Sequence, residues 1–175
     1  MKLGNKIIRE DKPTIFIADI AANHDGNLNK AIELIHSCAE AGADVAKFQH
    51  FQAETIVSDK GFKDLKSKKS HQSQWKKSVF KTYLDASLPL EWTKTLKKEC
   101  EKAKILFSTS PYSLDLVDYV DKYISFYKVG SGDITWHEIL EKISKKNKPL
   151  VLATGASSLK EVSLAVKKIE KLKKQ

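Results

Sequence analysis

The sequence lacks any apolar run that approaches the roughly 18 residues of a membrane span, so no transmembrane helix is predicted. The first residues, MKLGNKIIREDKP, have neither the apolar core nor the small-residue cleavage site of a secretory signal. There are only two cysteines, Cys38 and Cys100, and both fall in helix-like segments, which does not indicate a disulfide framework. These absences predict a cytoplasmic protein.

Arginine is nearly absent from a strongly basic chain. The formal net charge is +9, yet Arg9 is the single arginine. The lysines gather in a segment from Lys60 to Lys81, which has the composition of a loop, and in a last helix from Lys160 to Lys174. Because arginine makes many of the specific contacts to bases and phosphates, we expect a lysine-rich surface. A nucleic-acid-binding module is the alternative, and salt-dependent binding to RNA would reveal it.

The hydrophobic content is 41% of 175 residues, which is enough for one domain with a core. Two hydrophobic periods alternate along the chain, and each short apolar run is followed by a segment with helical spacing. Strands are predicted at Ile15–Ile20, Asp44–Phe51, Ile105–Ser110, Ser125–Gly132 and Pro149–Gly155. Helices are predicted at Leu28–Ala39, Leu90–Ala103, Ser113–Asp121, Trp136–Ser144 and Ser158–Lys174.

Serial strand–helix units predict an α/β fold with parallel strands and right-handed crossovers. No GxGxxG follows the first strand, which argues against a dinucleotide-binding fold. A (β/α)₈ TIM barrel needs eight such units, and this sequence supplies about the first five. We therefore expect one partial TIM-barrel domain over residues 1–175.

Polar residues follow each predicted strand, at the edge where an α/β active site is built. Singly, such residues can be helix caps, and we expect only that of Asn27 and Ser113. His71 and His137 are expected at the surface, and His24 is either a turn residue or a hydrogen-bond partner for a sugar or carbonyl. The strand-end residues are Asp19, Asn23, His24 and Asp25; Lys47, Gln49 and His50; Ser108 to Pro111; Lys128 and Gly130 to Asp133; and Thr154 and Gly155.

Two lysines, Lys47 and Lys128, lie inside apolar strands, where lysine is rare without an anionic partner. One interpretation is an internal ion pair with a carboxylate such as Asp19 or Asp133. The other is that both ammonium groups hold a substrate phosphate or carboxylate, together with nearby serine hydroxyls. The sequence leaves both interpretations open.

Four segments, taken in order, resemble the sialic acid synthase family, which makes N-acetylneuraminate and related nonulosonic acids such as legionaminate and pseudaminate. The first is FIADIAANHDGNLNKAIELIHSCAEAGADVAKFQHFQAE, and it is followed by FSTSPY at 107–112, YKVGSGDITWHEIL at 127–140 and LVLATGAS at 150–157. The resemblance runs from about Ile15 to the last helix. The order and spacing of the four segments make the resemblance specific.

The resemblance implies a transferase-type condensation of phosphoenolpyruvate with an N-acetylated amino-sugar aldehyde, giving a nonulosonic acid and phosphate. It also implies the roles of individual residues. Phosphoenolpyruvate would be held by Lys47, Ser110, Lys128 and Ser131; catalysis would involve Asp19, Asp133 and Lys47; and the sugar would be oriented by Gln49, Asn23 and His24. Two positions depart from the family pattern, which usually has glutamate at position 19 and threonine at position 110.

The resemblance further implies a divalent metal, Mn²⁺ or Mg²⁺, and a homodimer closed by a C-terminal antifreeze-like domain. The histidine ligands of that metal are expected beyond Gln175, as is the antifreeze-like domain. A makeshift site from Asp19, His24 and His50 is disfavoured because adjacent strand residues point to opposite faces. We therefore expect this chain alone to be inactive and a downstream complementary half to restore activity.

Other function classes stay open. The chain could be a non-catalytic remnant that binds a phosphorylated metabolite or a partner protein. It could also belong with the enzymes that make other 3-deoxy sugar acids by a related condensation, although NHDG and YKVGSGD favour the sialic acid branch.

Overall fold

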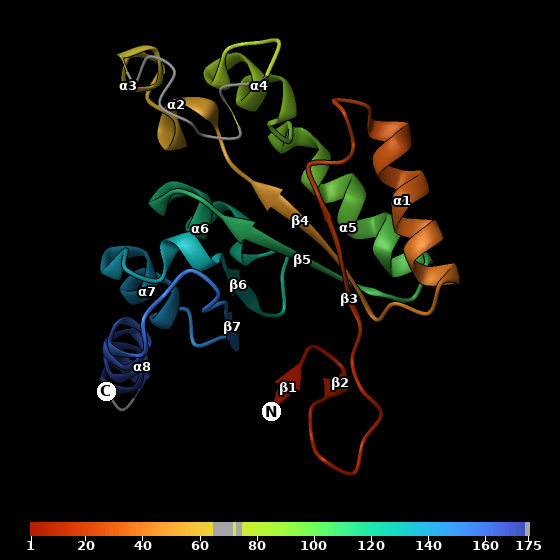
Figure 1. The fold of residues 1–175 in the computed structure, drawn as a ribbon. Helices are drawn as coiled ribbons and strands as arrows, with labels where there is room; N and C mark the ends of the chain where they lie inside the picture. Colours follow the sequence, from red (N-terminus) through yellow and green to blue (C-terminus); the bar gives the residue numbers. More distant parts are fainter. Residues whose placement is uncertain (65–71, 73–74, 174–175) are drawn as a thin grey trace.

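The computed structural model describes residues 1–64, 72 and 75–173 and consists mainly of five strand–helix units (Figure 1). The five predicted strands are confirmed, with small changes at their ends. They are β3 (Ile17–Ala21), β4 (Val45–His50), β5 (Leu106–Pro111), β6 (Tyr127–Val129) and β7 (Leu150–Leu152). The helices that follow them are α1 (Leu28–Glu40), α5 (Thr93–Lys102), α6 (Leu114–Asp121), α7 (His137–Ser144) and α8 (Leu159–Lys173).

The predicted helix boundaries have the expected capping chemistry. The side chain of Asn27 accepts a hydrogen bond from the Lys30 amide at 3.2 Å, and Ser113 accepts one from the Leu116 amide at 3.2 Å. Gly42 follows the end of α1 with φ at 85°, a conformation that glycine adopts without steric cost. Local sequence therefore sets where these helices begin and end.

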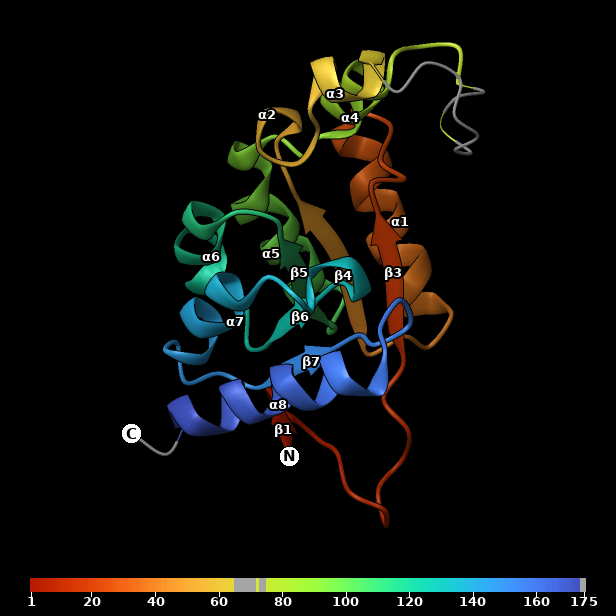
Figure 2. The ribbon, with the colours of Figure 1, turned by 60° about the vertical axis from the view of Figure 1, so that its left-hand side comes forward.

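These five strands are parallel and form two separate sheets. β3, β4 and β5 make one three-stranded sheet, in which Lys47 lies between Asp19 and Ser108 in register. β6 and β7 form a separate parallel pair. β5 and β6 lie side by side (Figure 2), yet no ladder joins them. β6 has only three residues, and its backbone pairs with β7.

A short antiparallel hairpin, which the sequence did not predict, precedes the first parallel strand. It joins β1 (Lys2–Leu3) to β2 (Lys6–Ile7), and its turn places Gly4 at a φ of 57°. The buried side chain of Leu3 packs with Val45 and Phe126. The hairpin therefore closes the end of the structure where the strands begin, as its place below the strands in Figures 1 and 2 shows.

The segment between β4 and α5 contains α2 (Ala53–Ile56), α3 (Asp59–Asp64), α4 (Val79–Ala86) and a 3₁₀ turn, η2 (Leu90–Trp92). The prediction of a loop from Lys60 to Lys81 is wrong at both ends. In α3, ion pairs Lys60–Asp64 at 2.5 Å and Lys63–Asp59 at 2.6 Å join successive turns. His71 lies outside the described residues. α2, α3 and α4 lie beyond the carboxyl end of β4 (Figure 1).

The apolar core lies between the strands and the helices. It includes Phe48, Phe107 and Tyr127 from the strands and Leu96 from α5. Two tryptophans, Trp92 and Trp136, are partly buried against this core and therefore serve packing. Over the described ranges, no helix is long and apolar enough to cross a membrane.

Candidate functional site

The inner face of the strands, which points away from the helices, is polar. Side chains alternate along a strand, so Lys47 on β4 points opposite to its neighbour Phe48, which packs in the helix-facing core. The register places Ser108 of β5 beside Lys47. Lys128 of β6 lies close enough to Lys47 for the second ammonium group to lower its pKa. The structure thus brings the two strand lysines together, as the sequence predicts.

Lys47 forms the internal ion pair that was one of the two interpretations. Its ammonium nitrogen lies 2.7 Å from the Asp19 carboxylate, and the lysine is only 5% exposed. The Asp19 side chain is 59% exposed. Because one partner is open to solvent, this pair leaves the buried cation accessible from the side of Asp19. The ion pair and an anion-binding role are therefore compatible.

Lys128 has no carboxylate partner among the described residues. Its ammonium group donates to the backbone carbonyl of Val129 at 2.9 Å. Burial, followed by repulsion from the nearby Lys47, lowers the pKa of Lys128, and the carboxylates of Asp19 and Asp133 only partly offset this. A partly buried cation beside a second cation creates positive potential that an anionic ligand would neutralise.

Asp133 lies in the 3₁₀ turn η3 (Ser131–Asp133), directly after β6. Burial raises the pKa of its carboxyl group, and nearby Lys128 opposes this only in part. The carboxylate folds back over Gly130, where a Cβ atom would approach Asp133 Oδ2 to 2.8 Å. Gly130 is therefore needed for contact with the carboxyl group, while Ser131 begins the turn and is partly exposed.

Two residues of the site were not assigned from the sequence. The hydroxyl of Ser108 is buried beside Lys47 and has no hydrogen-bond partner within the described part of the chain. The hydroxyl of Tyr112 accepts a hydrogen bond from Gln49 Nε2 at 3.3 Å. The signal that could have found them is the period of two, because positions 108, 110 and 112 share the inner side of the chain.

Two predicted sugar-binding residues lie apart from this group. Asn23 is exposed. His24 is fully buried, packs edge-to-face against Trp92 with ring centroids 5.7 Å apart, and accepts from the Gly26 amide at 3.1 Å. Burial lowers the pKa of His24, and none of the described residues makes a hydrogen bond to its Nε2 atom. In this structure His24 is therefore a buried residue behind the strand ends, neither a surface turn residue nor one that faces an open site.

Histidine geometry does not suit a metal ion at this edge. Both ring nitrogens of His50 are hydrogen-bonded at 2.8 Å, one to Thr109 and the other to Thr93. In the described ranges, no group of three or more histidine, cysteine or carboxylate side chains could hold a metal. The makeshift site from Asp19, His24 and His50 therefore does not form, and the residues present do not fit a divalent metal.

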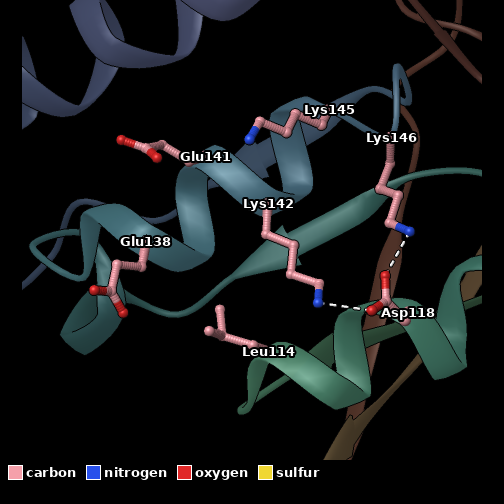
Figure 3. A pocket seen from close by; sticks show the side chains of 7 residues that line it. All are labelled: Leu114, Asp118, Glu138, Glu141, Lys142, Lys145 and Lys146. Atoms are coloured by element: carbon pink, nitrogen blue, oxygen red, sulfur yellow. Dashed lines mark ion pairs between the residues drawn. The ribbon is translucent and has the colours of Figure 1, made fainter.

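A separate surface cavity of about 620 Å³ lies between α6 and α7, away from the strand lysines. Figure 3 shows Lys142 and Lys146 reaching from the α7 side to Asp118 on α6, each with a nitrogen–oxygen distance of 2.6 Å. Glu141, also on this wall, pairs with Lys168 of α8. The ion pairs join the outer helices, and the cavity lining as a whole carries three carboxylates and three lysines, so it offers no unbalanced charge to a ligand.

Residues 34–175 match the model of the NeuB family. The chain belongs to this family. Among curated relatives, it is 37% identical over 159 residues to N,N'-diacetyllegionaminic acid synthase from Campylobacter jejuni, a match that covers 89% of this chain and 46% of that protein. It is 33% identical over 152 residues to human N-acetylneuraminate-9-phosphate synthase, covering 84% of this chain and 40% of that protein.

Solved structures agree with the strand–helix arrangement. The N-acetylneuraminic acid synthetase of Leptospira borgpetersenii, solved in complex with citrate, superposes with a TM-score of 0.84 at 25% identity, covering 99% of this chain and 55% of that one. A truncated 3-deoxy-D-arabino-heptulosonate 7-phosphate synthase from Thermotoga maritima gives 0.67 at 16% identity, covering 98% and 52%, and shows the fold alone. This NeuB-family fold is of the (β/α)₈ TIM-barrel type, of which the chain has five units. The chain spans less than half the length of the curated relatives described above.

Proposed function

We propose that this chain carries the phosphoenolpyruvate-binding part of a nonulosonic acid synthase. In the proposed reaction, C3 of phosphoenolpyruvate attacks the aldehyde carbon of an open-chain N-acetylated amino sugar. Water adds to C2, and cleavage of the C2–O bond releases inorganic phosphate. The observation that carries the proposal is the pair of strand lysines, Lys47 buried and Lys128 partly buried, beside a serine hydroxyl that has no hydrogen-bond partner among the described residues.

The inner face suits an anion with charge at two ends. Lys47 and Lys128 supply two cations on rigid strands, and the hydroxyls of Ser108 and Ser110 supply hydrogen-bond donors at the same edge. Preorganised cations stabilise the negative charge that builds up on the leaving phosphate. Ser131, at the start of η3, is the further predicted phosphate ligand.

Asp133 is suited to accept a proton from the attacking water. A general base works best when its pKa lies near the pH at which the enzyme operates. The pKa of Asp133 is raised by burial, which moves it in that direction. Asp19, more exposed and paired with Lys47, would face the sugar.

Binding of phosphoenolpyruvate is the first test. We expect phosphoenolpyruvate to raise the melting temperature of the chain, and Lys128→Met to reduce its affinity by about 30-fold or more, because a charged hydrogen bond is worth roughly 2 kcal/mol. Removing Lys128 also relieves its repulsion with Lys47, so the variant should be at least as stable as the parent without ligand.

The matched control is Lys98→Met, which removes the same charge from the exposed surface of α5. It should bind phosphoenolpyruvate like the parent. Equal affinity of all three proteins would contradict the proposed site. Phosphate release from phosphoenolpyruvate, N-acetylmannosamine and Mn²⁺ then tests catalysis, and we expect binding without turnover from the chain alone because no residue group described here fits the metal.

A further inference from the structure

Tyr112 is held rigidly at the carboxyl edge of the sheet. It follows Pro111, the last residue of β5, and its backbone amide donates to the carbonyl of His50 at 2.9 Å. Its ring packs edge-to-face against Phe51, with centroids 6.2 Å apart and an interplanar angle of 83°. Phe51 in turn packs against Tyr83 of α4 at 5.6 Å. The backbone and the ring together fix the position of the Tyr112 hydroxyl.

The hydroxyl has a hydrogen atom left to donate. Its oxygen accepts from Gln49 Nε2 at 3.3 Å, and no acceptor among the described residues takes a hydrogen bond from it. Burial, and then the carboxylates of Asp133 and Asp19, raise the pKa of Tyr112 to about 12, so the group stays protonated. Because Gln49 donates to the Tyr112 oxygen and leaves the phenol hydrogen unused, the O–H group of Tyr112 is available to an acceptor atom outside the protein.

The inner face changes character along the strands. Ser108 lies in register with Lys47, and Ser110 lies one level further out, in register with Gln49. Tyr112 follows two residues later, beyond the last register pair of β4 and β5. The cationic side chains thus occupy the inner level, Ser110 lies between that level and Tyr112, and Gln49 and Tyr112 offer neutral hydrogen-bonding groups at the outer level. An anion suits the first level, and a neutral polyhydroxylated molecule suits the second.

We propose that the Tyr112 hydroxyl donates a hydrogen bond to an oxygen of the open-chain amino-sugar acceptor, and that it selects the acceptor without contributing to phosphoenolpyruvate binding. This assignment rests on the proposed function. It names a residue that would bind the second substrate, the amino sugar. Tyr112 is then an acceptor-binding residue, fixed by Phe51 and oriented by Gln49. Loss of the hydroxyl alone should weaken binding of the amino sugar and leave binding of phosphoenolpyruvate unchanged.

The experiment measures the two affinities separately by isothermal titration calorimetry on the full 175-residue chain. The probes are phosphoenolpyruvate and, with phosphoenolpyruvate present, N-acetylmannosaminitol, the reduced open-chain form of N-acetylmannosamine. We expect Tyr112→Phe to weaken binding of the polyol about tenfold and to change phosphoenolpyruvate affinity less than twofold, since one neutral hydrogen bond is lost. Tyr83→Phe, which removes a hydroxyl from the same aromatic cluster, is the matched control and should leave both affinities unchanged.

A second readout reports on the hydroxyl directly. With tyrosine labelled by ¹³C at Cζ, the resonance missing from Tyr112→Phe identifies Tyr112, and the polyol should shift that resonance more than phosphoenolpyruvate does. Equal loss of both affinities, no loss in Tyr112→Phe, or no binding of the polyol by the parent would each overturn the assignment. Absence of phosphoenolpyruvate binding would overturn the proposed function instead. The Tyr112 assignment would then still be decided by whether Tyr112→Phe lowers the affinity for the polyol.

Discussion

On β4 and β5, the helix-facing side and the inner side are buried to nearly the same degree but are chemically opposite. Phe48 and Phe107 are 0% and 1% exposed, and their neighbours Lys47 and Ser108 are 5% and 0% exposed. The phenylalanines stack with centroids 5.8 Å apart. Lys47 instead has an exposed carboxylate as its partner, and the Ser108 hydroxyl has none.

Equal burial therefore has opposite energetic consequences on the two sides. Burying an aromatic ring stabilises the fold, whereas burying an ammonium group or an unpaired hydroxyl costs free energy. A chain selected for stability alone would have apolar side chains on both sides, as covered parallel sheets usually do. The polar inner side is understandable when a ligand supplies the missing partners, and this argument favours a binding site.

The largest expected effect tests the helix-facing side. Phe107→Ala removes a ring that contacts both Phe48 and His50 and leaves a cavity in the core. We expect the free energy of unfolding to fall by about 3–5 kcal/mol, measured by urea denaturation.

The adjacent substitution Ser108→Ala is the matched counterpart on the inner side. It removes a buried hydroxyl with no partner, so the free energy of unfolding should stay the same or rise by about 1 kcal/mol. Its affinity for phosphoenolpyruvate should fall. If Ser108→Ala destabilises the chain as much as Phe107→Ala, the contrast between the two sides is wrong.

The strand–helix units were predictable because their signals are local. Apolar runs of strand length, helical spacing and the caps Asn27 and Ser113 depend on neighbouring residues, and the structure confirms them. The hairpin over residues 2–7 was missed because strands of two residues have no period to detect. The helix at Asp59–Asp64 was missed because ion pairs, not an apolar stripe, support it.

The site was only partly predictable for a different reason. The sequence indicated that Lys47 and Lys128 need a partner. Only the structure shows that Lys47 forms an ion pair with Asp19, whereas Lys128 donates a hydrogen bond to a backbone carbonyl. The depth of His24 depends on Trp92, which lies far along the chain. Tyr112 acquires its role from Gln49, which lies on another strand. Contacts between distant segments are not visible in local patterns.

The second prediction concerns a polar residue on the apolar side. His50 is fully buried, and burial, followed by the nearby His24, lowers its pKa to about 3. His50 therefore stays neutral in the folded chain, whereas in the unfolded chain it takes up a proton below a pH of about 6.5. Below that pH, the free energy of unfolding should fall by about 1.4 kcal/mol per pH unit from this group, and above it His50 should contribute no pH dependence.

Urea denaturation at pH 7.5, 6.0 and 5.0 measures this slope. His50→Gln should flatten it, leaving the smaller contribution of His24, whose pKa is lowered in the same direction. His36→Gln, which changes a partly exposed histidine on α1, is the control for replacing a histidine outside the core. A slope that is unchanged in His50→Gln would show that the buried ring does not control acid stability.

The smallest expected effect on stability tests the inner side at β6. At Gly130 the backbone has φ −66°, which any residue adopts, so alanine there introduces no backbone strain. Its Cβ, however, would lie 2.8 Å from Asp133 Oδ2 and would displace that carboxyl group. Gly132, two residues later, has nothing within 4 Å of an added Cβ, which makes Gly132→Ala the matched control. We expect both variants to change the free energy of unfolding by less than about 1 kcal/mol.

Only Gly130→Ala should lower the pKa of Asp133, because a carboxyl group moved toward solvent loses the burial that raises its pKa. Titration of the Asp133 carboxyl resonance by NMR in the two variants measures this difference. Identical pKa values in Gly130→Ala and Gly132→Ala would show that contact with the Gly130 backbone does not set the environment of Asp133, and the inner side would then lose its candidate base.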